Sequence, residues 1–307
     1  MPPTRPEISD PAVARRLALD SSRFHEFLVE NAAGLGGRSI RDARLHRAYS
    51  YPYERLGFSF LATPERVYPL VGTGPGSALE MQVVCGTDVV RAGDVKDIAS
   101  VVAGVSIEPP RFPLLSYGAN VSIEGIGGKI GGLTGHDSIL PVIGGDLLDF
   151  DVVYSPHLTM YGALPSTIHP CAGARSPVAV LMATASQITA IARLEVNYRF
   201  GWLQDATFES RSAEISGDLY AFVSRHGTFA PDGHPLALSA VETVSRNFPA
   251  AHEKGALADA ARILKFESGE DIVYRTVEDY EWAVRQRPKL AEHSVPLDSQ
   301  QWVEFTG

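Results

Sequence analysis

Cysteine and long apolar runs are scarce in this sequence. Its 307 residues include two cysteines, Cys85 and Cys171, which are too few for a disulfide framework and do not form a paired metal-binding motif. No run of about 20 apolar residues is present, so we expect no membrane-spanning helix. The first residues also lack the apolar core of a signal peptide. Together these absences predict a cytoplasmic protein that makes no membrane contact.

Positive charge is also in short supply. Lysine and arginine number 27 against 36 aspartates and glutamates, which gives a net charge of −9. Nucleic-acid binding usually requires a basic face, so we expect no nucleic-acid partner. The 45% share of hydrophobic residues and the 21% share of charged residues are ordinary for a globular protein. A chain of this length holds one large domain or two smaller ones.

The apolar patterns predict short strands mixed with helices. Strict alternation of strand and helix is missing, so the α+β class is favoured over a doubly wound sheet. Helices are expected at 11–31, 94–105, 184–195, 253–266 and 276–287, and strands at 58–62, 113–117, 150–155, 177–183, 199–204 and 218–223.

Capping residues mark the starts of several helices. Asp94 stands at the start of the helix expected at 94–105, and Thr276 and Asp279 stand near the start of the last one. Thr184, followed three residues later by Gln187, forms a capping box. These positions give testable boundaries for three of the helices.

One segment marks a boundary within the chain. EPPRFP, at 108–113, interrupts regular structure, and the β-signals become stronger after it. We therefore predict an N-terminal helical and irregular segment, 1–108, followed by a domain, 109–307, that includes the C-terminal helices. Within the first part, residues 49–70 are rich in aromatic residues and proline, which indicates a packed irregular segment.

The glycine-rich stretch at 125–132 does not fit the common nucleotide-binding motifs. A Rossmann fingerprint that starts at Gly125 would need glycine at the position of Ile130. A P-loop would need serine or threonine after Lys129, where Ile130 stands. The stretch is therefore interpreted as a tight or flexible loop.

Metal and nucleophile candidates are weak as well. The spacing of His157, His169 and Cys171 matches no zinc pattern, and nothing nearby in the sequence predicts a reactive thiol. Ser116 and Ser155 lack the G-x-S-x-G elbow of hydrolases. We therefore expect neither a metal centre nor a serine or cysteine nucleophile.

Three ordered segments carry the strongest functional signal. In the first, 116–120, a strand runs into a small-residue turn whose backbone N–H groups can bind a carboxylate or an oxyanion. The second covers 154–157 and 161–167. In the third, 194–199, Glu195 stands at the end of a short helix just before a strand, which suits a general acid or base. The alternative is that Glu195 is a surface acid paired with Arg193 or Arg199.

Together these segments resemble the γ-glutamylcyclotransferase-like family. The resemblance covers roughly residues 112–230, about one small domain, and no matching motif is found in 1–105. It rests on the segments YGANVSIEGI (117–126), YSPHLTMYGALPST (154–167) and LEVNYR (194–199), which occur in the family's order.

The resemblance implies a fold, a site and a reaction. The fold would be a small mixed β-barrel with flanking helices and a cavity at one end. Glu195 would be the acid/base residue in an intramolecular cyclisation that releases 5-oxoproline and an amine, with no metal or cofactor. The ligand would be a small molecule that carries an amino-acyl amide. Its binding residues would be Tyr117, Gly118, Ala119 and Asn120 of the turn, together with Tyr154, Ser155, Tyr161, Gly162 and Tyr198.

Departures from the family pattern leave alternatives open. Ala119 stands where serine is usual, Leu194 replaces threonine and Val196 replaces proline. A lost hydroxyl in the turn is compatible with a related amide-bond or ring-forming enzyme of specialised metabolism, or with a non-catalytic module that binds a small acid or a protein. The N-terminal segment could cover the cavity and select a larger substrate, or form the surface of a homodimer.

Overall fold

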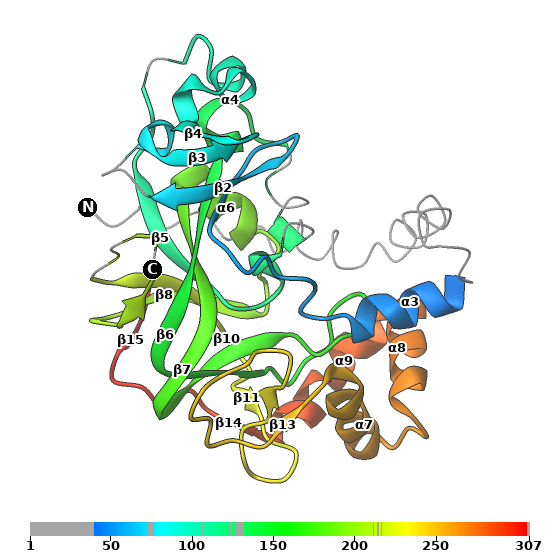
Figure 1. Ribbon diagram of the computed structural model, residues 1–307. Coiled ribbons are helices and arrows are strands. Elements are labelled where there is room, and N and C mark those ends of the chain that lie inside the picture. The colour runs from blue at the N-terminus through cyan, green and yellow to red at the C-terminus, as the bar shows by residue number, and fades with distance from the viewer. Residues whose placement is uncertain are drawn as a thin grey trace.

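The computed structural model describes residues 40–72, 77–105, 107–122, 125–126, 130, 132–210, 212–213, 215 and 217–305. The helix predicted at 11–31 lies outside these ranges, as does half of the glycine-rich stretch. The fold is of the mixed α+β class, as predicted, and most strands join one large sheet (Figure 1).

The sheet runs from β15 at one edge to β4 at the other. Neighbouring strands are antiparallel, except that β5 runs parallel to β10, and β12 parallel to β13. Within the described ranges the two edges do not pair, so the predicted closure into a barrel stays a prediction. The order is β15 (Trp302–Glu304), β8 (Tyr198–Leu203), β10 (Leu219–Ser224), β5 (Arg111–Ser116), β7 (Ser166–Thr184), β6 (Leu140–Tyr154), β1 (Phe60–Ala62), β2 (Val67–Gly72), β3 (Gln82–Cys85) and β4 (Asp88–Arg91).

Short strands complete the β-structure. They are β9 (Phe208–Glu209) and β12 (Ala237–Leu238), which pair with β6, then β13 (Ala250–Ala251), which pairs with β12, and β11 (Thr228–Phe229), which pairs with β14 (Ser294–Val295).

The long hairpin of β6 and β7 forms the centre of the sheet. The two strands have 15 and 19 residues, so the strands predicted at 150–155 and 177–183 are only parts of them. Glycine is unfavourable inside a strand, but at position 145 the close approach of β9 leaves no room for a side chain. A Cβ at this position would overlap the carbonyl oxygen of Glu209 in β9. Contacts with distant strands therefore extend the hairpin beyond its local signals.

Strand β1 comes from the N-terminal side of the predicted boundary at 108. It pairs with β6, with Phe60 opposite Val142 and Ala62 opposite Leu140. Strands β2, β3 and β4 continue the sheet from β1 as antiparallel neighbours. The part of the chain before 108 thus extends the sheet formed by the part after it.

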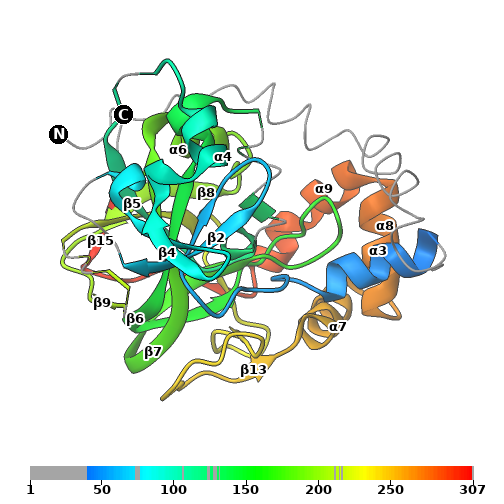
Figure 2. The same cartoon turned by 45° about the horizontal axis from the view of Figure 1, so that its top comes forward.

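Six α-helices lie in the described ranges, and four of them gather beside one end of the sheet (Figures 1 and 2). These four are α3 (Ile40–Tyr49), α7 (Glu253–Leu264), α8 (Gly269–Glu278) and α9 (Tyr280–Ala291). The other two are α4 (Lys96–Val101) and α6 (Ala185–Ala192), which lie nearer the opposite end. No helix of the described residues is long and apolar enough to span a membrane.

Two predicted helix boundaries need correction. The prediction of one helix at 276–287 is wrong, because α8 and α9 meet there. Asp279 caps α9 as expected, accepting a hydrogen bond from the N–H of Trp282 at 2.9 Å, but Thr276 is buried inside α8. Asp94 does not cap α4, since its carboxylate binds Arg91 at 3.0 Å and Val95 holds the capping position.

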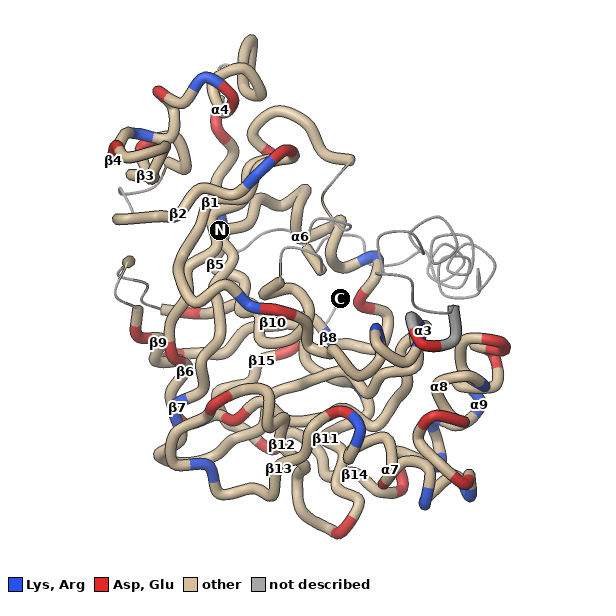
Figure 3. The backbone as a smooth tube through the Cα atoms, turned by 45° about the vertical axis from the view of Figure 1, so that its right-hand side comes forward, with Lys and Arg blue, Asp and Glu red and all other residues tan. Residues whose placement is uncertain are grey.

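Hydrophobic residues cover both faces of the sheet. Alternate residues of a strand point to opposite faces, so Leu114 and Leu115 of β5 belong to two different apolar clusters. One cluster includes Ile188 and Ile191 of α6, and the other includes residues of α7, α8 and α9. In the part of the chain that the structure describes, basic positions lie singly or beside acidic ones rather than in a continuous stripe (Figure 3).

Candidate functional site

A cavity of about 420 Å³ lies where four segments distant in the sequence meet. Its wall is formed by the end of β5 with the turn after it (114–120), the loop from β6 to the first residue of β7 (157–166), the connection from α6 to the first residue of β8 (193–198), and the end of α3 with the segment after it (47–53). Gly125, Phe222 of β10 and Tyr280 of α9 complete it. A volume of this size suits a small molecule.

Most of the residues predicted to form a site meet in this cavity. Glu195 lines it, and so do all four residues of the 117–120 turn, together with Tyr161 and Tyr198. These residues come from three separate segments of the sequence, so the fold brings them together as the motif order suggested.

Three of the predicted binding residues lie behind the wall instead. Tyr154 is buried in the core, where its hydroxyl donates to the carbonyl oxygen of Ala251 at 3.1 Å. Ser155 is fully buried and contacts His157 rather than the cavity. Gly162 packs against Val273 of α8. These three residues help to hold the loop that carries Tyr161.

Glu195 is joined directly to the 117–120 turn. The side-chain amide nitrogen of Asn120 donates to Oε1 of Glu195 at 3.1 Å. The backbone fixes Glu195 from both sides, since its N–H donates to Ala192 and its carbonyl oxygen accepts from Tyr198. Arg199, one of the partners expected for a surface acid, lies 3.1 Å from Glu304.

The helix before Glu195 is anchored at its first turn. The predicted capping box is confirmed: Thr184 accepts from the N–H of Gln187, and Gln187 accepts from the N–H of Thr184 at 2.9 Å. The amide nitrogen of Gln187 also donates to the carbonyl oxygens of Asp137 and Ile139, at 2.8 and 3.0 Å. The buried Ile188 then packs against the sheet.

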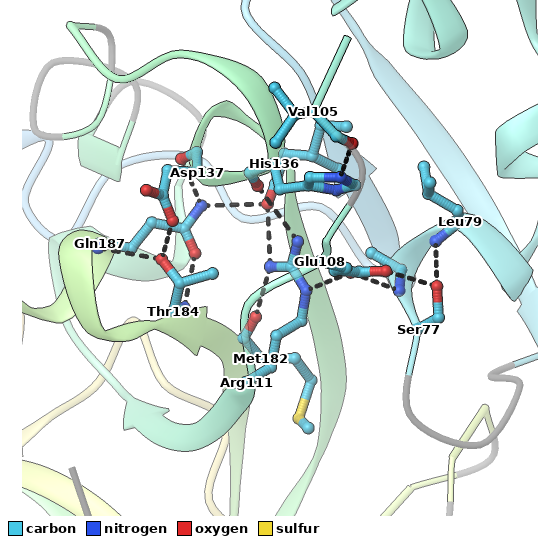
Figure 4. A network of polar contacts seen from close by, with 12 residues as sticks. Ser77, Leu79, Val105, Glu108, Arg111, His136, Asp137, Met182, Thr184 and Gln187 are labelled. Carbon is cyan, nitrogen blue, oxygen red and sulfur yellow. Dashed lines mark hydrogen bonds and ion pairs between the residues drawn. The ribbon is translucent and has the colours of Figure 1, made fainter. Parts of the chain in front are cut away.

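A polar network holds the start of β5 and the start of α6 together (Figure 4). The buried guanidinium of Arg111 donates to the carbonyl oxygens of His136, Ile139 and Met182 and pairs with Glu108 at 3.0 Å. Burial lowers the pKa of Arg111. The network fixes β5 and α6 at one end, and cavity residues lie at the other end of β5 and directly after α6.

The 117–120 turn packs tightly against the β6–β7 loop. A Cβ on Gly118 would lie 2.5 Å from Oγ of Ser166 and 2.7 Å from the hydroxyl oxygen of Tyr51. Tyr51 and Ser166 are themselves hydrogen-bonded at 2.7 Å. The guanidinium of Arg55 donates to the carbonyl oxygens of Tyr117 and Pro177. A side chain at 118 would therefore displace Ser166 or Tyr51, and glycine fits without this cost.

Four buried tyrosines of the wall stay uncharged. Burial raises the pKa of Tyr51, Tyr117, Tyr161 and Tyr198 above the ordinary value of 10.0. The hydroxyl of Tyr198 donates to the carbonyl oxygen of Ser166 at 2.8 Å, and that of Tyr117 donates to Phe222. These bonds fix the rings, so the cavity has a preformed wall.

Two polar atoms of residues that line the cavity lack partners among the described residues. They are Oδ1 of Asn120 and Oγ of Ser116, and both are buried. Buried polar atoms are normally hydrogen-bonded, so such atoms in a cavity wall favour a ligand that supplies the missing bonds. Oδ1 of Asn120 accepts only, and together with the carboxylate of Glu195 it suits an ammonium group.

Sequence reasoning missed several wall residues. Arg47, Tyr51 and Tyr53 come from the N-terminal segment, in which no motif was found, and the guanidinium of Arg47 stacks 4.9 Å from the ring of Tyr53 and 5.3 Å from that of Tyr161. Tyr280 was expected only as part of a helix. The aromatic composition of 49–70 was the one signal for Tyr51 and Tyr53.

His157 belongs to the second of the three functional segments and was also weighed as a metal or nucleophile partner, and it lines the cavity. His169 bonds Thr228 at 3.1 Å, and burial raises the pKa of the Cys171 thiol. The described part of the chain contains no group of three or more histidine, cysteine, aspartate or glutamate side chains placed to hold a metal.

Comparison with known proteins adds nothing to this geometry. No family model, no curated protein and no solved structure matches the chain. The function is therefore argued from the cavity and from the motifs that line it.

Proposed function

We propose that the protein is an enzyme that cleaves a γ-glutamyl-type or similar amino-acyl amide by intramolecular cyclisation. The products are 5-oxoproline and an amine, and Glu195 is the acid/base residue. One observation carries the proposal: Glu195 and the 117–120 turn line the same cavity and are joined by a hydrogen bond from Asn120. In this proposal the sheet is a γ-glutamylcyclotransferase-like barrel, and the enzyme works in the cytoplasm.

The reaction needs a single proton carrier. The carboxylate of Glu195 takes a proton from the α-ammonium of the substrate, and the freed amine attacks the γ-carbonyl carbon. A new C–N bond closes the five-membered ring and places a negative charge on the carbonyl oxygen. When the original amide C–N bond breaks, Glu195 gives this proton to the departing nitrogen. The ring nitrogen then loses its remaining extra proton to the same carboxylate, which passes it to the released amine, so that 5-oxoproline and an ammonium ion leave and Glu195 is again ionised. No water is consumed, and proximity of the two reacting groups supplies much of the acceleration.

The wall residues support this role in different ways. Oδ1 of Asn120 and the carboxylate of Glu195 form an acceptor pair for the α-ammonium, and Asn120 also holds Glu195 in place. The hydrogen-bonded tyrosines form a rigid wall around the folded substrate. Arg47, Tyr51 and Tyr53 bring the N-terminal segment to the wall, which supports a part for that segment in covering the cavity.

Incubation with a panel of γ-glutamyl amines and γ-glutamyl amino acids, followed by mass spectrometry for 5-oxoproline, tests the proposal. General acid–base catalysis contributes roughly a hundredfold to ten-thousandfold, so Glu195→Gln should lose activity on that scale. Glu242→Gln is the matched control, because Glu242 is exposed and does not line the cavity. Turnover that survives Glu195→Gln would contradict the assignment of the base.

The solvent isotope separates cyclisation from hydrolysis. In water labelled with ¹⁸O, cyclisation gives unlabelled 5-oxoproline, whereas hydrolysis gives glutamate that carries the label. Product from no member of the panel would contradict the proposed reaction. That negative result would favour a related ring-forming enzyme or a non-catalytic binding module, and Ala119 is compatible with both.

A further inference from the structure

His157 lies in the cavity wall and is not used by the cyclisation described above. Its side chain is almost fully buried, with 2% exposure, and borders the cavity. The ring packs edge-on against Tyr198, with centroids 5.7 Å apart, and lies 5.4 Å from the ring of His226. The backbone N–H of His157 donates to the carbonyl oxygen of Ser155 at 2.8 Å. The imidazole is therefore held in one orientation.

A chain of hydrogen bonds leads from this ring into the core. Nδ1 of His157 lies 2.8 Å from Oγ of Ser155, which lies 2.7 Å from Oγ of Ser224. Oγ of Ser224 accepts a hydrogen bond from the backbone N–H of His226 at 3.1 Å. Both serines are buried, with exposures of 0% and 1%. Because Nδ1 is turned to Ser155 behind the wall, Nε2 is the ring nitrogen left for the cavity.

The direction of the chain follows from its hydroxyl protons. Each serine hydroxyl donates one hydrogen. Among the described residues, Oγ of Ser155 is the only acceptor within reach of the Ser224 hydroxyl, because its other partner, the N–H of His226, is a donor. Ser224 therefore donates to Ser155, and Ser155 donates to Nδ1 of His157. The reverse order would leave the buried hydroxyl hydrogen of Ser224 without an acceptor.

This order decides where the ring proton sits. Nδ1 accepts a hydrogen bond, so a neutral ring carries its proton on Nε2. Burial, with His226 and Arg287 nearby, holds the pKa of His157 well below its ordinary value of 6.5. The ring is accordingly neutral at neutral pH, and Nε2–H is a fixed donor.

The geometry points to His157 as a hydrogen-bond donor to the carbonyl oxygen of the scissile amide, with Ser155 and Ser224 as positioning residues. This inference rests on the proposed function. Negative charge develops on that oxygen as the amine attacks, and a fixed N–H donor aimed at it stabilises the transition state. A neutral imidazole can act in this way without giving up its proton. Glu195 remains the group that carries the transferred proton.

The tautomer can be read in the free protein by ¹⁵N NMR of the histidine rings. We expect Nε2 of His157 to be protonated and Nδ1 to be unprotonated. Ser155→Ala removes the donor to Nδ1 and should shift the ring toward a mixture of tautomers. Ser100→Ala, at an exposed serine, should leave the spectrum unchanged. A protonated Nδ1 in the wild type would overturn the inference, whether or not the variants fold.

Kinetics test the use of this donor. His157→Leu removes the N–H group and should lower kcat by roughly a hundredfold to a thousandfold, with a smaller change in KM. His157→Gln keeps an N–H donor near the position of Nε2 and should retain more activity. Equal activity of His157→Leu and the wild type would overturn the inference while leaving the cyclisation intact. If no γ-glutamyl compound reacts, the proposed function fails. The NMR result then still decides which ring nitrogen of His157 is protonated.

Discussion

The side-chain amide of Asn120 and the carboxylate of Glu195 meet across the cavity wall, with Nδ2 and Oε1 3.1 Å apart. Asn120 belongs to the turn after β5 and Glu195 to the connection after α6. Both elements start at the polar network around Arg111 and Thr184 (Figure 4). The polar network joins β5 and α6 where they begin, and the bond between Asn120 and Glu195 joins the segments that follow them.

Loss of this bond should affect activity more than stability. A hydrogen bond to a charged group is worth about 1.5–3 kcal/mol, so Asn120→Ala should lower kcat/KM for 5-oxoproline formation by roughly ten- to a hundredfold. The matched control is Asn247→Ala, because Asn247 is exposed and does not line the cavity. Unchanged kcat/KM in Asn120→Ala would show that the amide does not orient Glu195.

The contact between Gly118 and the β6–β7 loop should appear as a stability effect. Alanine at 118 would place its Cβ 2.5 Å from Oγ of Ser166, and such overpacking costs about 1–3 kcal/mol. Urea denaturation of Gly118→Ala should show this loss. Gly57→Ala is the control, since no atom lies within 4 Å of a Cβ at that position. Equal stability of the two variants would mean that the turn can move away from Ser166.

Local signals explain what the sequence could predict. The capping box of Thr184 and Gln187 and the cap at Asp279 depend on residues three apart, so the sequence alone contains them. The motif order placed Glu195 and the 117–120 turn in one site. The strands at 113–117, 199–204 and 218–223 correspond to β5, β8 and β10.

The rest depends on contacts between distant residues. Gly145 looks like a weak point in a strand, and only the approach of Glu209 explains it. The hydroxyl of Tyr51 bonds Ser166, which lies far away in the sequence. The inferred tautomer of His157 depends on Ser155, which bonds Ser224 on another strand. Neither hydrophobic periodicity nor motif spacing in the sequence indicates which distant residues meet, so these residues could not be assigned to the site from the sequence alone.

The first turn of α6 should contribute to both stability and activity. Thr184 caps this helix and donates to Oδ1 of Asp137 at 2.5 Å, so Thr184→Ala should cost about 1–2 kcal/mol. Because α6 leads to Glu195, kcat should fall while the variant remains folded at 25 °C. Thr189→Ala, in the same helix, removes only a bond to Ala185 and should be close to neutral. A loss of similar size in Thr189→Ala would contradict a special role for the cap.

Glu253 should make the stability of the protein depend on pH. It begins α7 and is buried, and its Oε1 accepts from the N–H of Leu164 at 2.6 Å. Burial raises the pKa of Glu253 well above its ordinary value of 4.5. Between these two values the folded protein holds a proton that the unfolded chain has released. Unfolding is therefore favoured progressively as the pH rises from the lower value toward the higher one.

Glutamine at 253 cannot ionise, so it removes this dependence. We expect the urea midpoint of the wild type to fall relative to that of Glu253→Gln as the pH rises from about 5 to about 8, with the two proteins closest at the acid end. Glu278→Gln is the control, because Glu278 is exposed on α8, and its midpoint should follow that of the wild type at every pH. Parallel curves for the wild type and Glu253→Gln would show that Glu253 is ionised in the folded protein, with a cation or water compensating its charge.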